Sequence, residues 1–180
     1  MLFRSHTGYP YPPLYPASIA LAWSVLGRTI DVAQLANLAA VTILLISTFG
    51  IGCYVLTEFS AAVAAILVGL YPFMAWLSRE TMIDYWLVAL VALSMWALLK
   101  TDGFRQRNGS LAFGAVAGLG MLTKWTFPFF LLLPALWFAR KNWRNAIASA
   151  ALAAVISAWW YLPAASTLAN FYGQNTAGGI

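Results

Sequence analysis

The sequence predicts an all-α, polytopic helical membrane protein with about six apolar helices, two of them short, in a single transmembrane domain over residues 1–180. Of the 180 residues, 62% are hydrophobic and only 8% are charged, and the mean hydropathy is +0.78. Soluble domains carry about 25% charged residues, and a chain of this length could not bury so much apolar surface in a water-soluble core. Nine tryptophans and eight tyrosines fit a protein with two membrane–water interfaces, where amphipathic rings are enriched.

The charged and metal-binding residue types narrow the class of function. The net charge of +5 does not indicate a nucleic-acid partner, because the cations stand in small clusters between apolar runs, as topology determinants do. Cys53 has no second cysteine to pair with, and the single histidine, His6, rules out a histidine-rich metal cluster within the chain. The sequence therefore indicates no cofactor or metal site, and it leaves dependence on a divalent metal open.

Residues 1–32 are expected to form an outer loop that ends in an interfacial helix. Four prolines between residues 10 and 16 remove backbone donors and hold the preceding residues extended, so no helix is expected there. The apolar segment 17–28 is too short for a hydrocarbon core of about 30 Å at about 1.5 Å per residue. We expect it to lie near the interface and to close at Gly27 and Arg28.

The membrane spans are expected between residues 33 and 163. Long uncharged or nearly uncharged runs define them, and one proline, Pro72, is tolerable near the end of a membrane helix. The expected spans cover residues 33–57, 60–77, 85–99 with a start near Met82, and 146–163. The last one ends in an aromatic stretch and a proline, so residues 164–180 are expected to be a polar outer tail.

Residues 111–139 allow two interpretations, because the stretch is apolar except for Lys124 at its centre. It is either one long span or two short helices, 111–122 and 126–139, joined by a turn. Two helices place the basic clusters on either side of the stretch at the same membrane face, as the positive-inside rule requires. They also avoid a cation at mid-bilayer, which costs about 2.5–3.5 kcal/mol on insertion scales. We therefore predict two short helices with Lys124 near the outer surface.

Four ionisable residues mark the expected site. Arg79, Glu80 and Asp84 lie between two apolar runs, where charged groups are costly and indicate a functional site by default. With Lys124, they put two cations and two carboxylates at the face that also carries the tyrosine- and proline-rich loop. Arg79 and Lys124 suit a phosphate, while Asp84 or Glu80 would orient hydroxyl groups or the arginine. The simpler alternative is that Arg79 pairs with a carboxylate only to neutralise charge near the hydrocarbon.

Four segments in series resemble a known family. Residues 11–16 (YPPLYP) are similar to the Pro-Pro-Leu-aromatic signature in the first outer loop of GT-C glycosyltransferases of the glycosyltransferase family 39 type. That group includes the protein O-mannosyltransferases and the bacterial aminoarabinose transferases. Residues 77–79 (LSR) followed by Asp84, residues 118–124 (GLGMLTK) and residues 160–163 (WYLP) resemble later motifs of the family, in the same order.

The resemblance implies a GT-C-like integral-membrane glycosyltransferase that moves a sugar from a polyprenyl-phosphate donor to a protein, lipid or glycan acceptor. It implies a site on the outer face of a bacterial or archaeal plasma membrane. The residues it assigns to substrate binding are Arg79, Lys124, His6, Tyr9 and Tyr15, with Asp84 and Glu80 as supporting carboxylates.

The catalytic base is not among these residues. In the family, a carboxylate that precedes the Pro-Pro-Leu signature acts as base or orients the acceptor, whereas the first acidic residue here is Asp31. The resemblance therefore implies that the base lies upstream of Met1. It implies a fragment that lacks the first span, the catalytic acid and the C-terminal part, and we expect this fragment to be inactive on its own.

Two other classes remain open at this point. A fragment of a transporter or flippase would also combine short helices with intramembrane charge, and its site would lie near the bilayer midplane. A non-catalytic membrane scaffold would use the tyrosine- and proline-rich loop to bind a partner. The position of Lys124 separates the three: the outer face for the transferase, the midplane for the transporter, and a lipid-facing position for the scaffold.

Overall fold

The computed structural model describes residues 11–177, with side chains as far as residue 166. The described residues form helices joined by short connections, which confirms the all-α class. The helices are α1 (Leu14–Leu26), α2 (Ile30–Gly52), α3 (Glu58–Leu70), α4 (Pro72–Leu77), α5 (Ile83–Lys100), α6 (Arg107–Met121), α7 (Phe127–Ala139) and α8 (Trp143–Ala177). Within the described residues, α2, α5 and the Trp143–Ser166 part of α8 are long and apolar enough to cross a membrane, and α1, α3 and α7 are shorter apolar helices.

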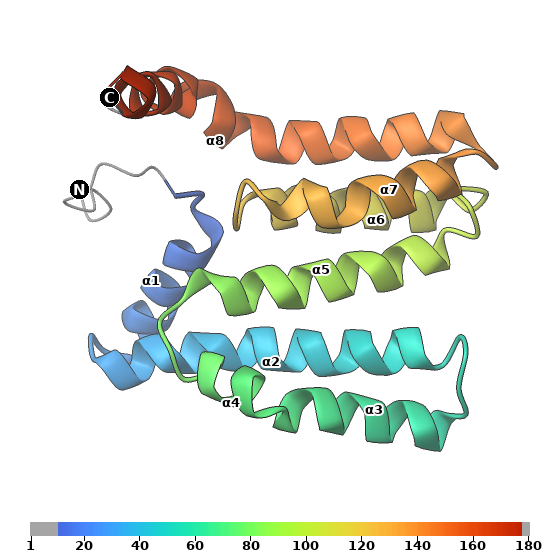
Figure 1. Ribbon diagram of the computed structural model, residues 1–180. Coiled ribbons are helices and arrows are strands. Elements are labelled where there is room, and N and C mark those ends of the chain that lie inside the picture. The colour runs from blue at the N-terminus through green and yellow to red at the C-terminus, as the bar shows by residue number, and fades with distance from the viewer. Residues whose placement is uncertain (1–10, 178–180) are drawn as a thin grey trace.

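The long helices run back and forth along one axis, as Figure 1 shows. Helix α5 lies in the middle, with α2 on one side and α6 and α7 on the other, and α8 packs against α6 on the far side from α2. Because the helices alternate in direction, their connections gather at two ends. We call the end with connections 78–82 and 122–126 the site end, and the end with connections 53–57, 101–106 and 140–142 the basic end.

The stretch around Lys124 forms two helices, α6 and α7, that double back on each other, in agreement with the prediction from charge. The α6 glycines allow this hairpin to pack closely on α8. A Cβ added at Gly118 would lie 2.8 Å from the Ile156 Cβ, which is closer than real Cβ atoms approach. Small residues at such positions let membrane helices come together, since van der Waals contact drives their association.

The expected span over residues 60–77 is broken, which corrects the prediction of one continuous helix. Helix α3 ends at Leu70, Tyr71 is extended with φ −56° and ψ 124°, and Pro72 begins α4. The residue before a proline is sterically disfavoured in the helical region, and proline itself suits the first position of a helix. The break therefore turns the chain before the site end.

Other helix boundaries differ from the expected ones for local reasons. Helix α1 begins at Leu14 rather than residue 17, because Pro16 in its first turn removes no intrahelical hydrogen bond. Helix α2 begins at Ile30, where the Thr29 hydroxyl accepts the Val32 N–H at 3.2 Å and Asp31 lies in the first turn. Residues 53–57 form a turn instead of completing that span.

The prediction that the last helix ends at Pro163 is wrong. Helix α8 continues to Ala177, so the expected polar tail is largely helical. The C-terminal part of α8 changes direction in Figure 1, and a proline inside a helix is an ordinary cause of such a bend. Membrane helices tolerate an interior proline where neighbouring groups satisfy the freed carbonyl.

Candidate functional site

An ion pair joins two distant parts of the chain at the site end. Lys124 lies in the turn between α6 and α7, and Asp84 lies in the first turn of α5. The Lys124 Nζ donates to the Asp84 Oδ1 at 2.7 Å, with side-chain exposures of 26% and 45%. The buried Thr123 hydroxyl donates to the Gly120 carbonyl and so helps to fix the turn that carries Lys124. The carboxylate of Asp84 also suits the positive end of the α5 dipole.

The proline-rich segment is docked directly on this turn. The Leu14 N–H donates to the Leu122 carbonyl at 2.9 Å, and the Pro12 side chain is fully buried. Since Leu122 is two residues before Lys124, this bond links the start of α1 to the turn that carries the lysine. Two of the four segments that carry the family resemblance, residues 11–16 and 118–124, are therefore neighbours in space.

Tyr15, an expected substrate-binding residue, lies inside the protein. Its side chain is 8% exposed and packs in the core with Leu77 and Tyr85. The hydroxyl has no hydrogen-bond partner among the described residues, and burial raises the pKa of Tyr15 to about 12. Its contacts place it under the site end rather than on its surface.

Three predicted features fall on or before residues 1–10, which lie outside the described residues. His6 and Tyr9 are expected to bind substrate, and the catalytic base is expected upstream of Met1. All three stay predictions. The geometry of the site end comes from the described residues alone.

Arg79 and Glu80 stand in the connection 78–82, which a residue of α2 holds in place. The buried Asn37 donates from its Nδ2 to the Ser78 carbonyl at 3.0 Å and to the Glu80 carbonyl at 2.8 Å. Arg79, between these two anchor points, is exposed and makes no ion pair with any carboxylate of the described residues. The simple neutralisation of Arg79 by Glu80 or Asp84 is therefore not what the structure contains.

Asn37 was missed by the reasoning from sequence. The available signal was an amide side chain within a run of residues that carries no charge from Ala33 to Thr57. Such a group must find a hydrogen-bond partner when it is buried. The sequence does not indicate which partner, because the carbonyls that Asn37 binds lie more than forty residues away.

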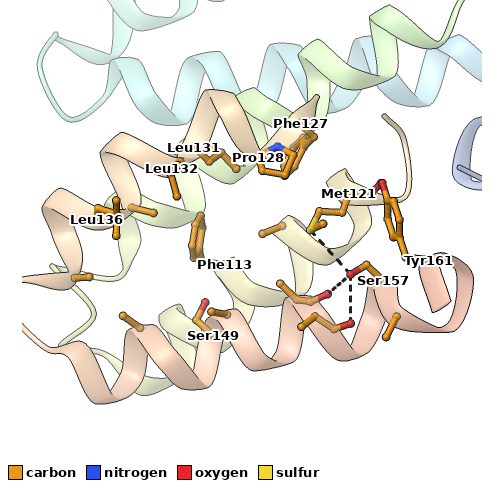
Figure 2. Close-up of a pocket in the computed structure, with 18 of the residues that line it drawn as sticks. Phe113, Met121, Phe127, Pro128, Leu131, Leu132, Leu136, Ser149, Ser157 and Tyr161 are labelled. Carbon is orange, nitrogen blue, oxygen red and sulfur yellow. Dashed lines mark hydrogen bonds between the residues drawn. The ribbon is translucent and has the colours of Figure 1, made fainter. Parts of the chain in front are cut away.

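An apolar groove between α6, α7 and α8 was also not foreseen. It has a volume of about 560 Å³ and runs along α7, from Phe104 and Ala139 near the basic end to Met121 and Tyr161 near the site end. Figure 2 shows its walls, with the Ser157 hydroxyl hydrogen-bonded to carbonyls of its own helix. The Tyr161 hydroxyl donates to the Met121 carbonyl at 2.8 Å and joins α8 to α6 at the site end of the groove.

No group of three or more histidine, cysteine, aspartate or glutamate side chains gathers within residues 11–166 in a way that could hold a metal ion. At the site end, the charged groups that contact each other, Lys124 and Asp84, have opposite signs and neutralise each other. At the site end of the described chain, the arrangement thus offers an exposed guanidinium and a paired ammonium. Both could bind an anionic group.

The sequence profile of a family described as dolichyl-phosphate-mannose-protein mannosyltransferase matches residues 10–165. The matched stretch includes α1 to α7 and most of the membrane-spanning part of α8, and hence both partners of the Lys124–Asp84 pair. No curated protein and no solved structure matches the chain.

Proposed function

Since the chain belongs to the dolichyl-phosphate-mannose-protein mannosyltransferase family, we propose that its site end receives the phosphate of a lipid-phosphate-linked sugar during glycosyl transfer. The observation that carries this proposal is the Lys124–Asp84 pair, 2.7 Å apart, beside a docked proline-rich segment. If the pair only stabilised the fold, its lysine could be fully buried. The Lys124 side chain instead keeps 26% of its surface exposed, so its ammonium can also contact a ligand.

The two cations have complementary roles in this proposal. A lysine ammonium has three N–H donors, and one of those on Lys124 is directed at Asp84, which leaves two for a phosphate oxygen. Arg79 adds a planar fork suited to two oxygens of one phosphate. A phosphate that leaves the sugar gains negative charge, and cations already in position stabilise that charge at little reorganisation cost. Asp84 would hold Lys124 in place, and Glu80 would support the acceptor or Arg79.

The membrane side and the substrates are part of the same proposal. We place the site end on the outer face, because basic connections favour the cytoplasmic side. The donor would be a polyprenyl-phosphate sugar and the acceptor a hydroxyl or amine of a protein, lipid or glycan. The position of Lys124 supports this function over a transporter: it lies in a turn at one end of the bundle, not halfway along a span.

Binding of a short-chain polyprenyl phosphate to the full chain in lipid nanodiscs tests the proposal. We expect Arg79→Gln and Lys124→Met each to weaken binding roughly tenfold or more, since each removes a charge-assisted hydrogen bond to the phosphate. Arg28→Gln is the matched control, because Arg28 is an exposed cation at the same end outside the proposed site.

Unchanged binding in both Arg79→Gln and Lys124→Met would overturn the assignment. Arg79 is exposed and unpaired in the described chain, so its substitution should leave the fold intact even if Lys124→Met does not. Far-UV circular dichroism checks the helical content of each variant.

A further inference from the structure

The basic end carries a surplus of positive charge. Its connections and adjoining helix ends hold six cations against two carboxylates, Asp102 and Glu58. Among the described residues, the ion pair found at this end joins Arg105 to Asp102 at 3.9 Å, between two largely exposed side chains. The cations are Lys100, Arg105, Arg107, Arg140, Lys141 and Arg144. Most of this charge is therefore free to bind an anionic partner.

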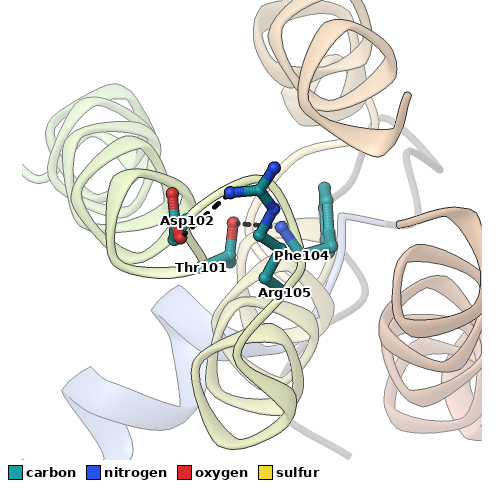
Figure 3. Close-up of polar contacts among 4 residues, drawn as sticks. All are labelled: Thr101, Asp102, Phe104 and Arg105. Atoms are coloured by element: carbon teal, nitrogen blue, oxygen red, sulfur yellow. Dashed lines mark hydrogen bonds and ion pairs between the residues drawn. The ribbon is translucent and has the colours of Figure 1, made fainter. Parts of the chain in front are cut away.

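The connection 101–106 is held by a bond of its own and by a bond to the start of α8, which follows the connection 140–142. Figure 3 shows the Thr101 hydroxyl accepting the Phe104 N–H, at 3.0 Å. The Asn145 Nδ2, from α8, donates to the Phe104 carbonyl at 2.7 Å. Asp102 and Phe104 have positive φ values of 47° and 61°, a conformation that surrounding contacts must hold. The buried Phe104 ring, in turn, lines one end of the apolar groove.

Two of the arginines lie over exposed tryptophan rings. The Arg140 guanidinium is 4.4 Å from the centre of the Trp137 ring, and the Arg144 guanidinium is 5.8 Å from that of Trp143. Both rings are more than 60% exposed. Tryptophan is enriched at the level of lipid headgroups, and a cation over its face is attracted to the ring. These contacts keep both guanidinium groups beside side chains of the type that is enriched at the level of lipid headgroups.

The apolar groove opens beside these cations. Ala139, which lines the groove, directly precedes Arg140, and Ala146 lines it two residues after Arg144. At the opposite end of the groove, the hydrogen bond from Tyr161 to Met121 joins α8 to α6. The Lys124 side chain there points away from the groove, toward Asp84 on α5, and α6 and α7 lie between α5 and α8. A chain that lies in the groove is therefore better placed to carry an anionic head at the basic end than at the site end.

We propose that the groove and the basic end together bind an anionic phospholipid, with one acyl chain between α7 and α8 and the phosphate beside Arg140 and Arg144. Charge complementarity supports this occupant, because clusters of four to eight cations next to membrane helices favour anionic headgroups. The groove would supply the apolar half of the same site. The lipid is a bound ligand at the end away from Lys124, distinct from the sugar donor.

Spin-labelled phosphatidylglycerol and phosphatidylcholine, compared on the full chain in nanodiscs of phosphatidylcholine, test this proposal. We expect the immobilised fraction to be several-fold larger for phosphatidylglycerol, and the difference to shrink at high salt. The double variant Arg140→Gln/Arg144→Gln should remove most of this preference and bring the two immobilised fractions close to each other, since each juxtamembrane cation contributes to headgroup binding. Ala150→Phe, which fills the groove without changing charge, should reduce immobilisation of both lipids.

Arg28→Gln removes an exposed cation from the other end and should leave the preference unchanged. Equal immobilisation of the two lipids by the unmodified chain would overturn the proposal, and this comparison needs no variant to fold. Polyprenyl phosphate should displace the labelled phosphatidylglycerol less well from the double variant than from the unmodified chain. Equal displacement from both would show that Arg140 and Arg144 do not bind the lipid phosphate, and the proposal would fail. Full displacement by inorganic phosphate would show a simple anion site and contradict the role of the acyl chain.

Discussion

The two ends of the helical bundle handle charge in opposite ways. At the site end, the described residues include three cations and three carboxylates, and one pair is joined at 2.7 Å. At the basic end, six cations face two carboxylates, and the one close pair in the described chain is 3.9 Å apart and exposed. Balanced charge allows each group to be placed by a specific partner. Surplus charge of one sign instead acts collectively, on the orientation of the chain and on the lipids around it.

The backbones of the two ends are both held by contacts between distant residues. At the site end, Asn37 holds residues 78–80, and Leu14 binds Leu122. At the basic end, Thr101 holds the connection 101–106 locally, and Asn145 of α8 binds the Phe104 carbonyl across 41 residues. The two ends therefore differ in the balance of their charge and not in whether tertiary contacts fix their connections.

The largest expected difference between the two ends is in their accessibility from outside the cell, which labelling of Cys53 measures. Cys53 is the single cysteine of the chain and is exposed in the 53–57 turn at the basic end. If the basic end is cytoplasmic, a membrane-impermeant maleimide should leave Cys53 unlabelled in intact cells and label it after the membrane is permeabilised. A Cys53→Ser/Thr81→Cys chain, with its thiol at the site end, should show the reverse pattern. Labelling of Cys53 in intact cells would show that the basic end faces outward, and the proposed orientation would be wrong.

Replacement of Asn37 by leucine should loosen the site end alone. It leaves the Ser78 and Glu80 carbonyls without their donor, which costs about 1–3 kcal/mol of unfolding free energy. Trypsin should then cut faster after the exposed Arg79, with no change in cutting after Arg105. Thr42→Val, an exposed change in the same helix, is the control. Equal acceleration at both ends would mean that Asn37 stabilises the whole fold rather than this connection.

Double-mutant cycles should separate the two ion pairs. Lys124→Met and Asp84→Asn are expected to show a coupling of about 1 kcal/mol, at the upper end of the range for partly exposed pairs. The Arg105–Asp102 pair is longer and more exposed, so the corresponding cycle should give a coupling close to zero. Unfolding in increasing fractions of sodium dodecyl sulfate in mixed micelles measures both. Similar couplings would remove the energetic distinction between the ends.

Tyr15→Phe should have the smallest effect and should show it mainly at high pH. Because burial raises the pKa of Tyr15 to about 12, above its ordinary value of 10.0, ionisation of the phenol favours the unfolded chain. The unmodified protein should thus lose stability as the pH rises from about 10 to about 12, with no such loss from this group below that window. The phenylalanine variant should lose less over the same range and, lacking an unpaired buried hydroxyl, be no less stable at pH 7. A steeper alkaline loss in the variant would contradict the buried position.

Much of the architecture followed from properties local to the sequence. Low charge and long apolar runs predicted an all-α membrane protein, and the basic clusters on either side of residues 111–139 predicted the α6–α7 hairpin. The same reasoning put Asp84 and Lys124 at one end of the bundle, where they form an ion pair. Hydropathy and charge are sufficient here because a bilayer imposes the same depth and the same interfaces on every segment.

Only the tertiary structure decided how the segments meet. Asn37 finds its partners 41 and 43 residues away, Tyr15 turns into the core, and α6, α7 and α8 leave a groove between them. The break at Pro72 and the passage of α8 through Pro163 show that the same residue type ends one helix and lies inside another. The reason is physical: such outcomes depend on which distant side chains and carbonyls become neighbours, and residue order alone does not specify those contacts.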